Sequence, residues 1–348
     1  MQICTVKHTD KSKFENRVIM KKITEKILSQ KGKTIPILSF PSVQLLGVTV
    51  GELVTSAELQ AEGMAAVVSR GNLGAAVTPM DLSVEAECFG APVRKTDDEV
   101  PTVEYPILED IMDADKLTVP QVGAGRSELY IEGTRKAREL LPDLPIFCGA
   151  IGPYSLAGRL FDMTELMMEC YDDPDEVKIL LTKATDFIIE YIKAHKAAGA
   201  DGVILAEPAA GLLSPSLCEE FSSEFVKRIV EEVADDDFVF CYHNCGGSVA
   251  ACAESIAEIG ADIYHFGNAV PLTEVIGKIP KDSVVMGNID PLIFRDGTTE
   301  DVRAAVDKVF AECSGYENFM ISSGCDIPAD AKWENLDAYF ARVGEIYD

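Results

Sequence analysis

The sequence is poor in tryptophan, histidine and basic residues. It contains one Trp and four His, and its 31 Lys and Arg face 58 Asp and Glu, which gives a net charge of −27. Proteins that bind the phosphate backbone of nucleic acids need a basic face, so this composition argues against such a partner. No window of about 18 consecutive apolar residues occurs, so we expect no helix that spans a membrane.

The N-terminal segment lacks the apolar core of an export signal. It reads "MQICTVKHTDKSKFENRV", which is polar almost throughout, so the sequence favours a cytoplasmic protein with reduced thiols. A chain of 348 residues needs no disulfide staples, and by default each cysteine is interpreted as a small buried hydrophobic residue. The ten cysteines are Cys4, Cys88, Cys148, Cys170, Cys218, Cys241, Cys245, Cys252, Cys313 and Cys325.

The sequence does contain a regular series of short apolar runs. They do not alternate between polar and apolar residues, which indicates strands that are buried on both faces. Each ends in a polar or glycine-containing turn. The eight runs cover residues 34–40, 74–81, 144–153, 201–208, 238–245, 261–268, 283–291 and 317–326.

Helical patterns separate most of these runs. One begins with Ser214 as N-cap and Pro215 at the first helical position, and another offers Thr298 and Asp301 as a capping box. Buried strands that alternate with helices predict a parallel α/β fold, a (β/α)8 TIM barrel formed by a single domain, 1–348. The competing open sheet is disfavoured because no G-x-G-x-x-G follows an early strand.

Two segments do not fit the repeating unit. Residues 1–33 predict an N-terminal helical extension. Residues 82–143 are too long for one turn and one helix, so we expect an insertion after the second strand that covers one face of the barrel and could include a small hairpin.

Catalytic residues of such barrels lie where the carboxyl ends of the strands meet, at one mouth. Six of the predicted strands end in polar groups that could line it. These residues are Asp81, Glu207, His243, Cys245, His265, Asn268, Asn288, Asp290, Cys325 and Asp326.

His243, Cys245 and Cys325 stand apart in this set because imidazole and thiolate are ligands that zinc prefers. Alternate residues of an extended chain point the same way, so His243 and Cys245 can both face the mouth, and barrel closure can bring Cys325 near. Gly246 leaves room for a bulky ligand. The H-x-C spacing alone also arises by chance in a chain with ten cysteines.

The pattern "HNCG" with a lone cysteine near the end of the last strand resembles the zinc motif of the methylcobamide:coenzyme M methyltransferases. These enzymes belong to the uroporphyrinogen decarboxylase superfamily. Other matching stretches are "GADGVILAEPAAGLLSPSLCEEF", "GADIYHFGN", "MGNIDPLIFRDGTTEDV" and "GCDIPADAKWENLDAYF". The resemblance covers most of the chain and is strongest from residue 144 onward.

The resemblance implies a zinc-dependent methyltransferase. His243, Cys245 and Cys325 would hold Zn2+, and the acceptor's sulfur would take the open position and attack the methyl group of a corrinoid. A small partner protein would carry that corrinoid. The acceptor would be a thiol such as coenzyme M, or else tetrahydrofolate; transfer from a donor onto the corrinoid is the reverse possibility.

Further residues receive less defined roles. Glu207 is a candidate fourth zinc ligand or a group that orients His243, although it could only cap the next turn. Asp81, Asn268, Asp290 and Gly246 are candidates for the corrinoid side of the mouth, and Asp290 could simply hold its loop in shape. His265, inside an apolar run, is interpreted as a core histidine.

Two other functions remain open from the sequence. One is a metal-free tetrapyrrole decarboxylase, which the resemblance disfavours because the stretch "ILSFPSVQLLGVTVGEL" lacks the arginine-rich segment that decarboxylases use to neutralise their polyanionic substrate. The other is a non-catalytic protein that binds a corrinoid or its carrier protein.

Overall fold

The computed structural model describes residues 22–347 of the chain. Its central feature is a parallel, seven-stranded sheet in the order β1-β4-β5-β6-β7-β8-β9. Every neighbouring pair is parallel, as expected for strands that alternate with helices. The strands are β1 Ala76–Val77, β4 Ile146–Ile151, β5 Gly202–Ala206, β6 Val239–Asn244, β7 Ile263–Phe266, β8 Val284–Ile289 and β9 Phe319–Ser323.

The run 34–40 was predicted as a strand, and this prediction is wrong in detail. The segment forms only an isolated parallel bridge between Thr34 and Leu73. On its other side, serine side chains replace the backbone ladder: Ser322 Oγ donates to Ile35 O, and Ile37 N donates to Ser323 Oγ. Pro36 interrupts any ladder because it has no N–H. The segment still lies between β9 and β1, where an eighth strand would close the barrel.

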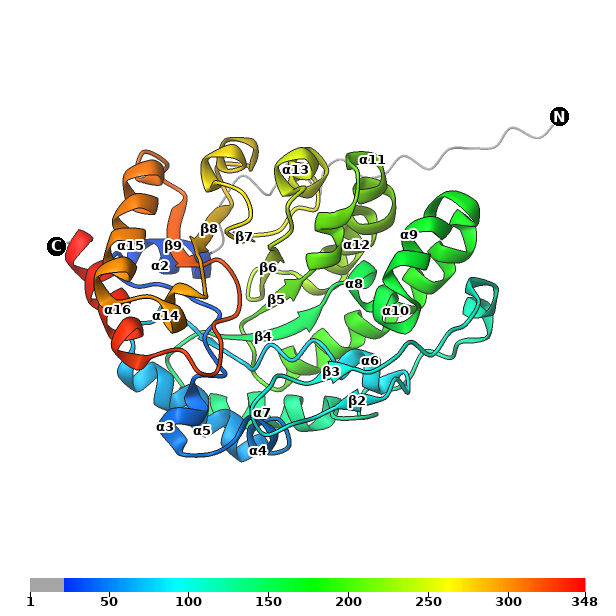
Figure 1. The fold of residues 1–348 in the computed structure, drawn as a ribbon, viewed down its shortest axis with the longest axis horizontal. Coiled ribbons are helices and arrows are strands. Elements are labelled where there is room, and N and C mark those ends of the chain that lie inside the picture. The colour runs from blue at the N-terminus through cyan, green and yellow to red at the C-terminus, as the bar shows by residue number, and fades with distance from the viewer. Residues whose placement is uncertain (1–21, 348) are drawn as a thin grey trace.

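The helices surround the strands, and Figure 1 shows the chain progressing once round this ring, from α5 in blue to α16 in red. The predicted caps are present: Ser214 accepts from Leu217 N, and Thr298 and Asp301 form the capping box. The helices are α2 Lys22–Ser29, α3 Ser42–Leu46, α4 Val50–Leu53, α5 Ala57–Arg70, α6 Val84–Cys88, α7 Ser127–Leu140, α8 Pro153–Leu160, α9 Met163–Asp172, α10 Pro174–Ala197, α11 Pro215–Cys218, α12 Glu224–Val233, α13 Val249–Ala257, α14 Ile293–Asp296, α15 Thr299–Cys313 and α16 Trp333–Tyr347.

Shorter helical turns complete the element list. A π-helical segment, η3 (Glu219–Ser223), joins α11 to α12, and the remaining turns are the 3-10 helices η1 Ile111–Lys116, η2 Pro208–Leu212, η4 Leu272–Glu274 and η5 Ile276–Lys278. The described part of the predicted N-terminal extension contains α2, and the extension with its boundaries stays a prediction. Its earlier part lies outside the described residues.

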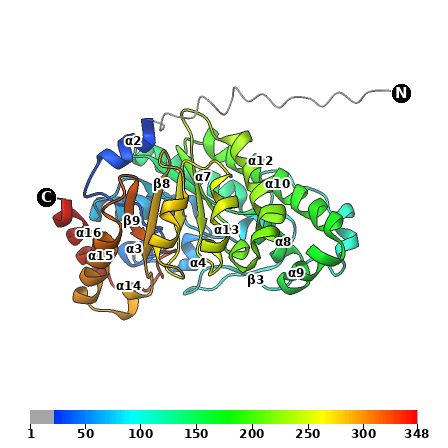
Figure 2. The ribbon, with the colours of Figure 1, turned by 90° about the horizontal axis from the view of Figure 1, so that it is seen from above.

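Two apolar layers hold the barrel together. Side chains that point inward form a compact cluster inside the sheet, which includes Val77, Phe147, Ile204, Cys241 and Met286. A larger cluster fills the space between the strands and the helices that cover them. Figure 2 shows the ribbon from above, with α10 and α16 on opposite sides of the strands. The predicted barrel architecture is therefore confirmed. Within residues 22–347, no helix combines the length and the apolar character that crossing a bilayer requires.

The segment 82–143 contains α6, a small hairpin, η1 and α7. The hairpin strands β2 (Val93–Arg94) and β3 (Thr102–Val103) pair antiparallel. Backbone bonds fasten the segment at two points, since Val50 N donates to Asp97 O and Ile107 N donates to Leu160 O, the last residue of α8. The segment therefore runs from α4 to α8 along one side of the barrel (Figure 1).

Candidate metal centre at the barrel mouth

His243, Cys245 and Cys325 meet at the carboxyl edge of the sheet. His243 lies near the end of β6, Cys245 follows that strand, and Cys325 follows β9. One ligand atom from each residue lies within 4.8 Å of the other two. The His243 Nε2 atom is 3.6 Å from Cys325 Sγ. The two pieces of chain that the sequence predicted to converge therefore do so.

Hydrogen bonds fix which nitrogen of His243 faces the thiols. His265 Nε2 lies 2.7 Å from Ser323 O, a carbonyl that can only accept, so this nitrogen carries the hydrogen. Burial, followed by the nearby His243, lowers the pKa of His265 well below its ordinary value, so the ring is neutral and its Nδ1 is an acceptor. His243 Nδ1, 2.7 Å from that atom, must donate to it. His243 Nε2 consequently presents a lone pair towards Cys325.

The two thiols interact and differ in acidity. Interaction with Cys325 lowers the pKa of Cys245 to about 7, against the effect of burial. Interaction with Cys245, together with burial, raises the pKa of Cys325 to about 12. Near neutral pH Cys245 is therefore partly ionised while Cys325 keeps its proton, and a cation bound between them would favour the loss of the remaining protons.

The donor set fits a zinc ion. With ordinary zinc–sulfur and zinc–nitrogen bond lengths, a tetrahedral site separates these two ligand atoms by about 3.6 Å. The spacing between His243 Nε2 and Cys325 Sγ is 3.6 Å. Both cysteines are only partly buried, whereas His243 is 2% exposed. Three protein ligands with solvent access would leave one coordination position free for another molecule.

Glu207 lies apart from this group. It follows β5, is fully buried, and accepts hydrogen bonds from Tyr154 N at 3.0 Å and Ser155 N at 2.7 Å. It thereby caps the first turn of α8, a helix that precedes it in the chain, whereas the alternative left open by the sequence was a cap on the turn that follows it. Burial raises its pKa to about 7. A role as fourth ligand would require these bonds to break, and that role stays a prediction.

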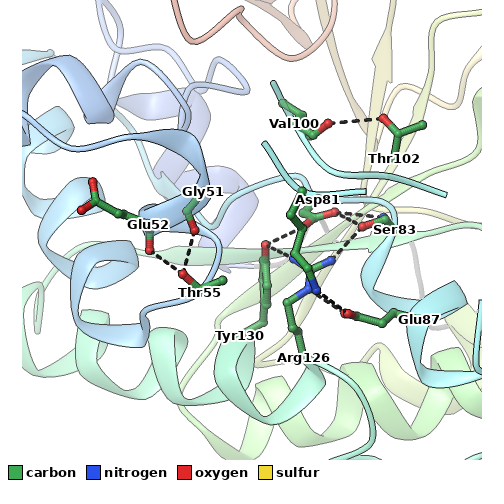
Figure 3. A network of polar contacts seen from close by, with 11 residues as sticks. Gly51, Glu52, Thr55, Asp81, Ser83, Glu87, Val100, Thr102, Arg126 and Tyr130 are labelled. Atoms are coloured by element: carbon green, nitrogen blue, oxygen red, sulfur yellow. Dashed lines mark hydrogen bonds and ion pairs between the residues drawn. The ribbon is translucent and has the colours of Figure 1, made fainter. Parts of the chain in front are cut away.

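Asp81 lies at the other side of the mouth, in a closed network of polar contacts (Figure 3). One carboxylate oxygen accepts from Ser83 N, and the other accepts from Tyr130 Oη at 2.7 Å and from Arg126. Arg126 also donates to Glu87 at 2.6 Å. Burial disfavours the charge on Arg126, but Asp81, Tyr130 and Glu87 together outweigh this and raise its pKa. Every oxygen of Asp81 is thus already engaged within the protein.

The other candidates for the corrinoid side occupy different environments. Asn268 is exposed and lies against Gly324, next to the third ligand. Asp290 is exposed and accepts from Leu292 N, so in this structure it holds its own turn. Gly246 packs on Gly211, where an added Cβ would lie 2.4 Å from the backbone. The backbone of Gly211 therefore fills the space beside Gly246. A corrinoid contact from any of these residues stays a prediction.

Two residues of the site were missed by the sequence analysis. His265 was interpreted as a core histidine; it is fully buried, but it also orients His243, which it faces directly in the β6–β7 register. The signal was the Tyr-His pair that occurs near the end of both strands, Tyr242–His243 and Tyr264–His265. Gly267 was also missed: a Cβ there would lie 2.5 Å from Cys245 Cα, so only glycine allows this approach.

The remaining interpretations of histidine and cysteine can be compared with the structure. Cys241 is buried in the inner cluster, in agreement with a packing role. His195 is buried against Tyr191 and bonds Thr134 Oγ1 at 2.8 Å, away from the mouth. The nine cysteines within the described part of the chain are all free.

Comparison with known proteins gives a consistent relationship. The family model for uroporphyrinogen decarboxylase (URO-D) matches residues 37–346. The chain is 27% identical over 295 residues to the methylcobamide:CoM methyltransferase MtbA of Methanosarcina mazei, covering 82% of this chain and 85% of that relative. It is also 27% identical over 302 residues to a uroporphyrinogen decarboxylase of Coxiella burnetii, covering 82% and 81%.

A solved methyltransferase from Methanosarcina mazei has the same fold. It superposes with a TM-score of 0.82 at 23% identity, covering 95% of this chain and 99% of that structure. The match of the family model over almost the whole described chain, together with these relatives and this fold, shows that the protein belongs to the uroporphyrinogen decarboxylase family and resembles its methylcobamide:CoM methyltransferase branch.

Proposed function

We propose that this protein is a zinc-dependent methyltransferase that moves a methyl group between a corrinoid and a thiol acceptor. The observation that carries the proposal is the convergence of His243 Nε2 with the sulfurs of Cys245 and Cys325, all within 4.8 Å. The similarity to methylcobamide:CoM methyltransferases supports the methyl chemistry. Zinc at this position would supply a Lewis acid that keeps an acceptor thiol ionised at neutral pH.

The proposed transfer balances without a redox partner. The acceptor loses its thiol proton to solvent, and its sulfur forms a bond to the methyl carbon. The carbon–cobalt bond of a methyl-Co(III) corrinoid breaks, and both electrons remain on cobalt as Co(I). The residues of this chain have separate tasks in that step. His243 and the two cysteines position the reacting sulfur, while His265 fixes the His243 ring.

The corrinoid would be supplied by a small partner protein that docks over the mouth. Asp81, Asn268, Asp290 and Gly246 are proposed to face that side, in line with their places after β1, β7, β8 and β6. Tetrahydrofolate is the alternative acceptor. The free cysteines suit a chain that works in the reducing cytoplasm.

Metal analysis with a matched pair of cysteine variants tests the proposal. Purified wild type should contain about one zinc per chain, and Cys325→Ala should lose most of it. Cys241→Ala, which removes a thiol from the packed interior, should keep the metal. Equal zinc content in all three proteins would remove Cys325 from the site.

A second experiment tests the reaction. Methylcobalamin and a thiol are mixed with the protein under anaerobic conditions, and demethylation is followed by visible absorbance. Wild type and Cys241→Ala should consume methylcobalamin, whereas Cys325→Ala should not. If neither a thiol nor tetrahydrofolate accepts the methyl group, the proposed reaction is wrong even when zinc is bound.

A further inference from the structure

A second pair of thiols lies near the candidate metal centre but takes no part in it. Cys218 is the last residue of α11, in the segment that follows β5, and Cys252 lies in α13, the helix that follows β6. The two helices pack directly against each other. Cys218 is fully buried and Cys252 is 2% exposed, and both cysteines are free.

Hydrogen bonds connect each thiol to the element that carries the other. Cys218 Sγ lies 3.9 Å from Ser223 Oγ, which donates to Ser255 Oγ at 3.3 Å. Ser255 is one turn after Cys252 on α13 and donates to the Cys252 carbonyl at 3.1 Å. From the other side, Cys252 Sγ donates to Leu213 O, in the segment that leads into α11. The two thiols therefore share one small polar cluster between the helices.

Cys218 differs in acidity from buried thiols elsewhere in the described chain. Interaction with Cys252 lowers the pKa of Cys218 to about 7, although burial acts in the opposite direction. Interaction with Cys218, and then burial, raises the pKa of Cys252. Burial raises the pKa of Cys170 and of Cys313 to about 11. A thiolate beside a protonated thiol favours disulfide chemistry, because the thiolate is the nucleophile.

The pair lies close to the surface although its sulfurs are buried. Ala251 and Glu254 flank Cys252 on α13 and are exposed, and the residue after Cys218, Glu219, is exposed as well. Glu219 also begins the π-helical turn η3. Such turns occur frequently at functional sites, and here the turn starts directly after the more acidic thiol.

The segments that carry the two thiols meet again beside Cys245. Ser248 donates to Gly211 O through its backbone N at 3.2 Å and through its hydroxyl. Gly246 and Gly211 approach so closely that a Cβ added to either would lie 2.4 Å from the Cα of the other. A covalent link between the two thiols would therefore fasten these segments at a second point, beyond the contact next to the metal ligand.

We propose that Cys218 and Cys252 are a redox-active pair that a peroxide converts into a reversible disulfide, and that this bond clamps the segment after β5 to the segment after β6. Formation of this bond needs neither zinc nor a methyl group, so it goes beyond the proposed function and is independent of it. The clamp would restrain the chain on one side of the candidate metal centre.

The oxidation balances with hydrogen peroxide as the oxidant. The Cys218 thiolate attacks one peroxide oxygen, so that a sulfur–oxygen bond forms, the oxygen–oxygen bond breaks, and the leaving hydroxide takes up a proton to become water. The Cys252 sulfur then attacks the resulting sulfenic acid. A sulfur–sulfur bond forms, the sulfur–oxygen bond breaks, and the leaving hydroxide takes the Cys252 proton as a second water. The two sulfurs lose two electrons, which the peroxide gains.

Mapping of the thiols by mass spectrometry tests the proposal. The full chain is treated with hydrogen peroxide, its remaining thiols are alkylated after unfolding, and its peptides are analysed with and without dithiothreitol. The peptides that contain Cys218 and Cys252 should be joined with the loss of two hydrogens and should separate on reduction. Cys313 should stay a thiol. The proposal is wrong if Cys218 and Cys252 are both recovered as thiols, or if Cys218 is joined to a different cysteine.

Two serine variants provide the matched comparison. Cys252→Ser should form no link to Cys218, and dimedone should then trap Cys218 as the sulfenic acid. Cys313→Ser, which changes a buried thiol on α15, should form the link as wild type does. If dimedone does not label Cys218 in Cys252→Ser, Cys218 is not the residue that peroxide attacks, and the proposed order of steps is wrong.

Hydrogen exchange measures the clamp in the same samples. Oxidation of wild type should slow the exchange of amides in 208–218 and 246–257 by at least about threefold, because the link restrains local opening of both segments. Exchange in Cys252→Ser should not slow after the same treatment. Unchanged exchange in the linked wild type would overturn the clamp. A wild type that binds no zinc would contradict the proposed function and leave these outcomes unaffected.

Discussion

The two sides of the barrel mouth use polar residues in opposite ways. On the side of β1, Asp81 and Arg126 form a closed network in which each charged group already has its partners. On the side of β6 and β9, His243 and the two cysteines contact one another, and the His243 lone pair is directed at a sulfur. The strands β4 and β5 separate the two sides in the sheet.

The difference shows why strand-end position alone does not identify a ligand site. Asp81 follows the buried strand β1 and His243 lies near the end of the buried strand β6, and both side chains are almost fully buried. What separates them is whether their polar atoms are already paired. Charged groups that pair with each other stabilise the structure, whereas soft donors without counter-charges remain available to a metal. Four variants can test this contrast, from the largest expected effect to the smallest.

Cys245→Ser should abolish stoichiometric zinc binding. The change replaces a soft thiolate with a weakly acidic hydroxyl, so the purified variant should hold less than about a tenth of the wild-type zinc. Metal analysis of dialysed protein measures this. Cys252→Ser provides the control, since Cys252 is a buried thiol on α13 that bonds Leu213 O. If both variants lose zinc, the cause is unfolding of the protein and not the loss of a metal ligand.

Asp81→Asn should destabilise the protein and leave the metal in place. Removing the carboxylate leaves Arg126 buried without its main counter-charge, which costs about 3–5 kcal/mol of unfolding free energy. Urea denaturation measures the loss, and Asp337→Asn, at an exposed pair with Arg70, should cost about 0–1 kcal/mol. A zinc content that falls with Asp81→Asn would show that the two sides of the mouth are not independent.

Glu85→Gln should change how stability depends on pH. Burial raises the folded-state pKa of Glu85 to about 7, above its ordinary value of 4.5, so the folded chain holds a proton that the unfolded chain has lost. This contribution is fully present below about pH 4.5 and is lost as pH rises through about 7. It amounts to roughly 2–3 kcal/mol between pH 5 and pH 8.

The variant should therefore lose that part of the pH dependence. Wild type should lose stability over this range, and Glu85→Gln should lose less, with Glu207, whose pKa burial also raises to about 7, still contributing. Urea denaturation at pH 5 and pH 8 measures the difference. Identical pH profiles for the two proteins would mean that Glu85 titrates normally.

His265→Phe should weaken zinc binding without removing a ligand. The substitution keeps a buried ring but deletes the acceptor that holds His243 Nδ1–H, so zinc affinity should fall by about ten- to a hundredfold. Competition with a chromogenic chelator measures affinity. His195→Phe, a change at the buried ring on α10, is the control and should leave zinc affinity unchanged. A normal affinity in His265→Phe would reduce that histidine to a packing residue.

The sequence predicted the barrel and the meeting of the three candidate ligands for a clear physical reason. Buried parallel strands have a strong apolar signal, and their carboxyl ends must share one edge, so Cys325 had to approach His243 once the barrel was inferred. The resemblance to a zinc methyltransferase pointed to the same residues.

Features that depend on segments without a periodic sequence pattern could not be predicted. Arg126 precedes α7 inside the segment 82–143, which has no periodic pattern that would place it beside Asp81. The hydrogen bonds by which Glu207 caps α8 depend on where α8 begins relative to β5. The run 34–40 bonds to serine side chains of β9 and not to its backbone, which the sequence of the run does not indicate. Pro36 in that run was the one local sign of its irregularity.

The serine pair in β9 joins three distant parts of the chain. Ser322 and Ser323 bond the run 34–40, Ser323 O accepts from His265, and Cys325 follows two residues later. The proposed metal site would therefore need the complete ring of strands, because a partly folded barrel would offer an imidazole and one sulfur with no fixed third donor. The zinc content of a preparation would accordingly report whether the run 34–40 has packed against β9.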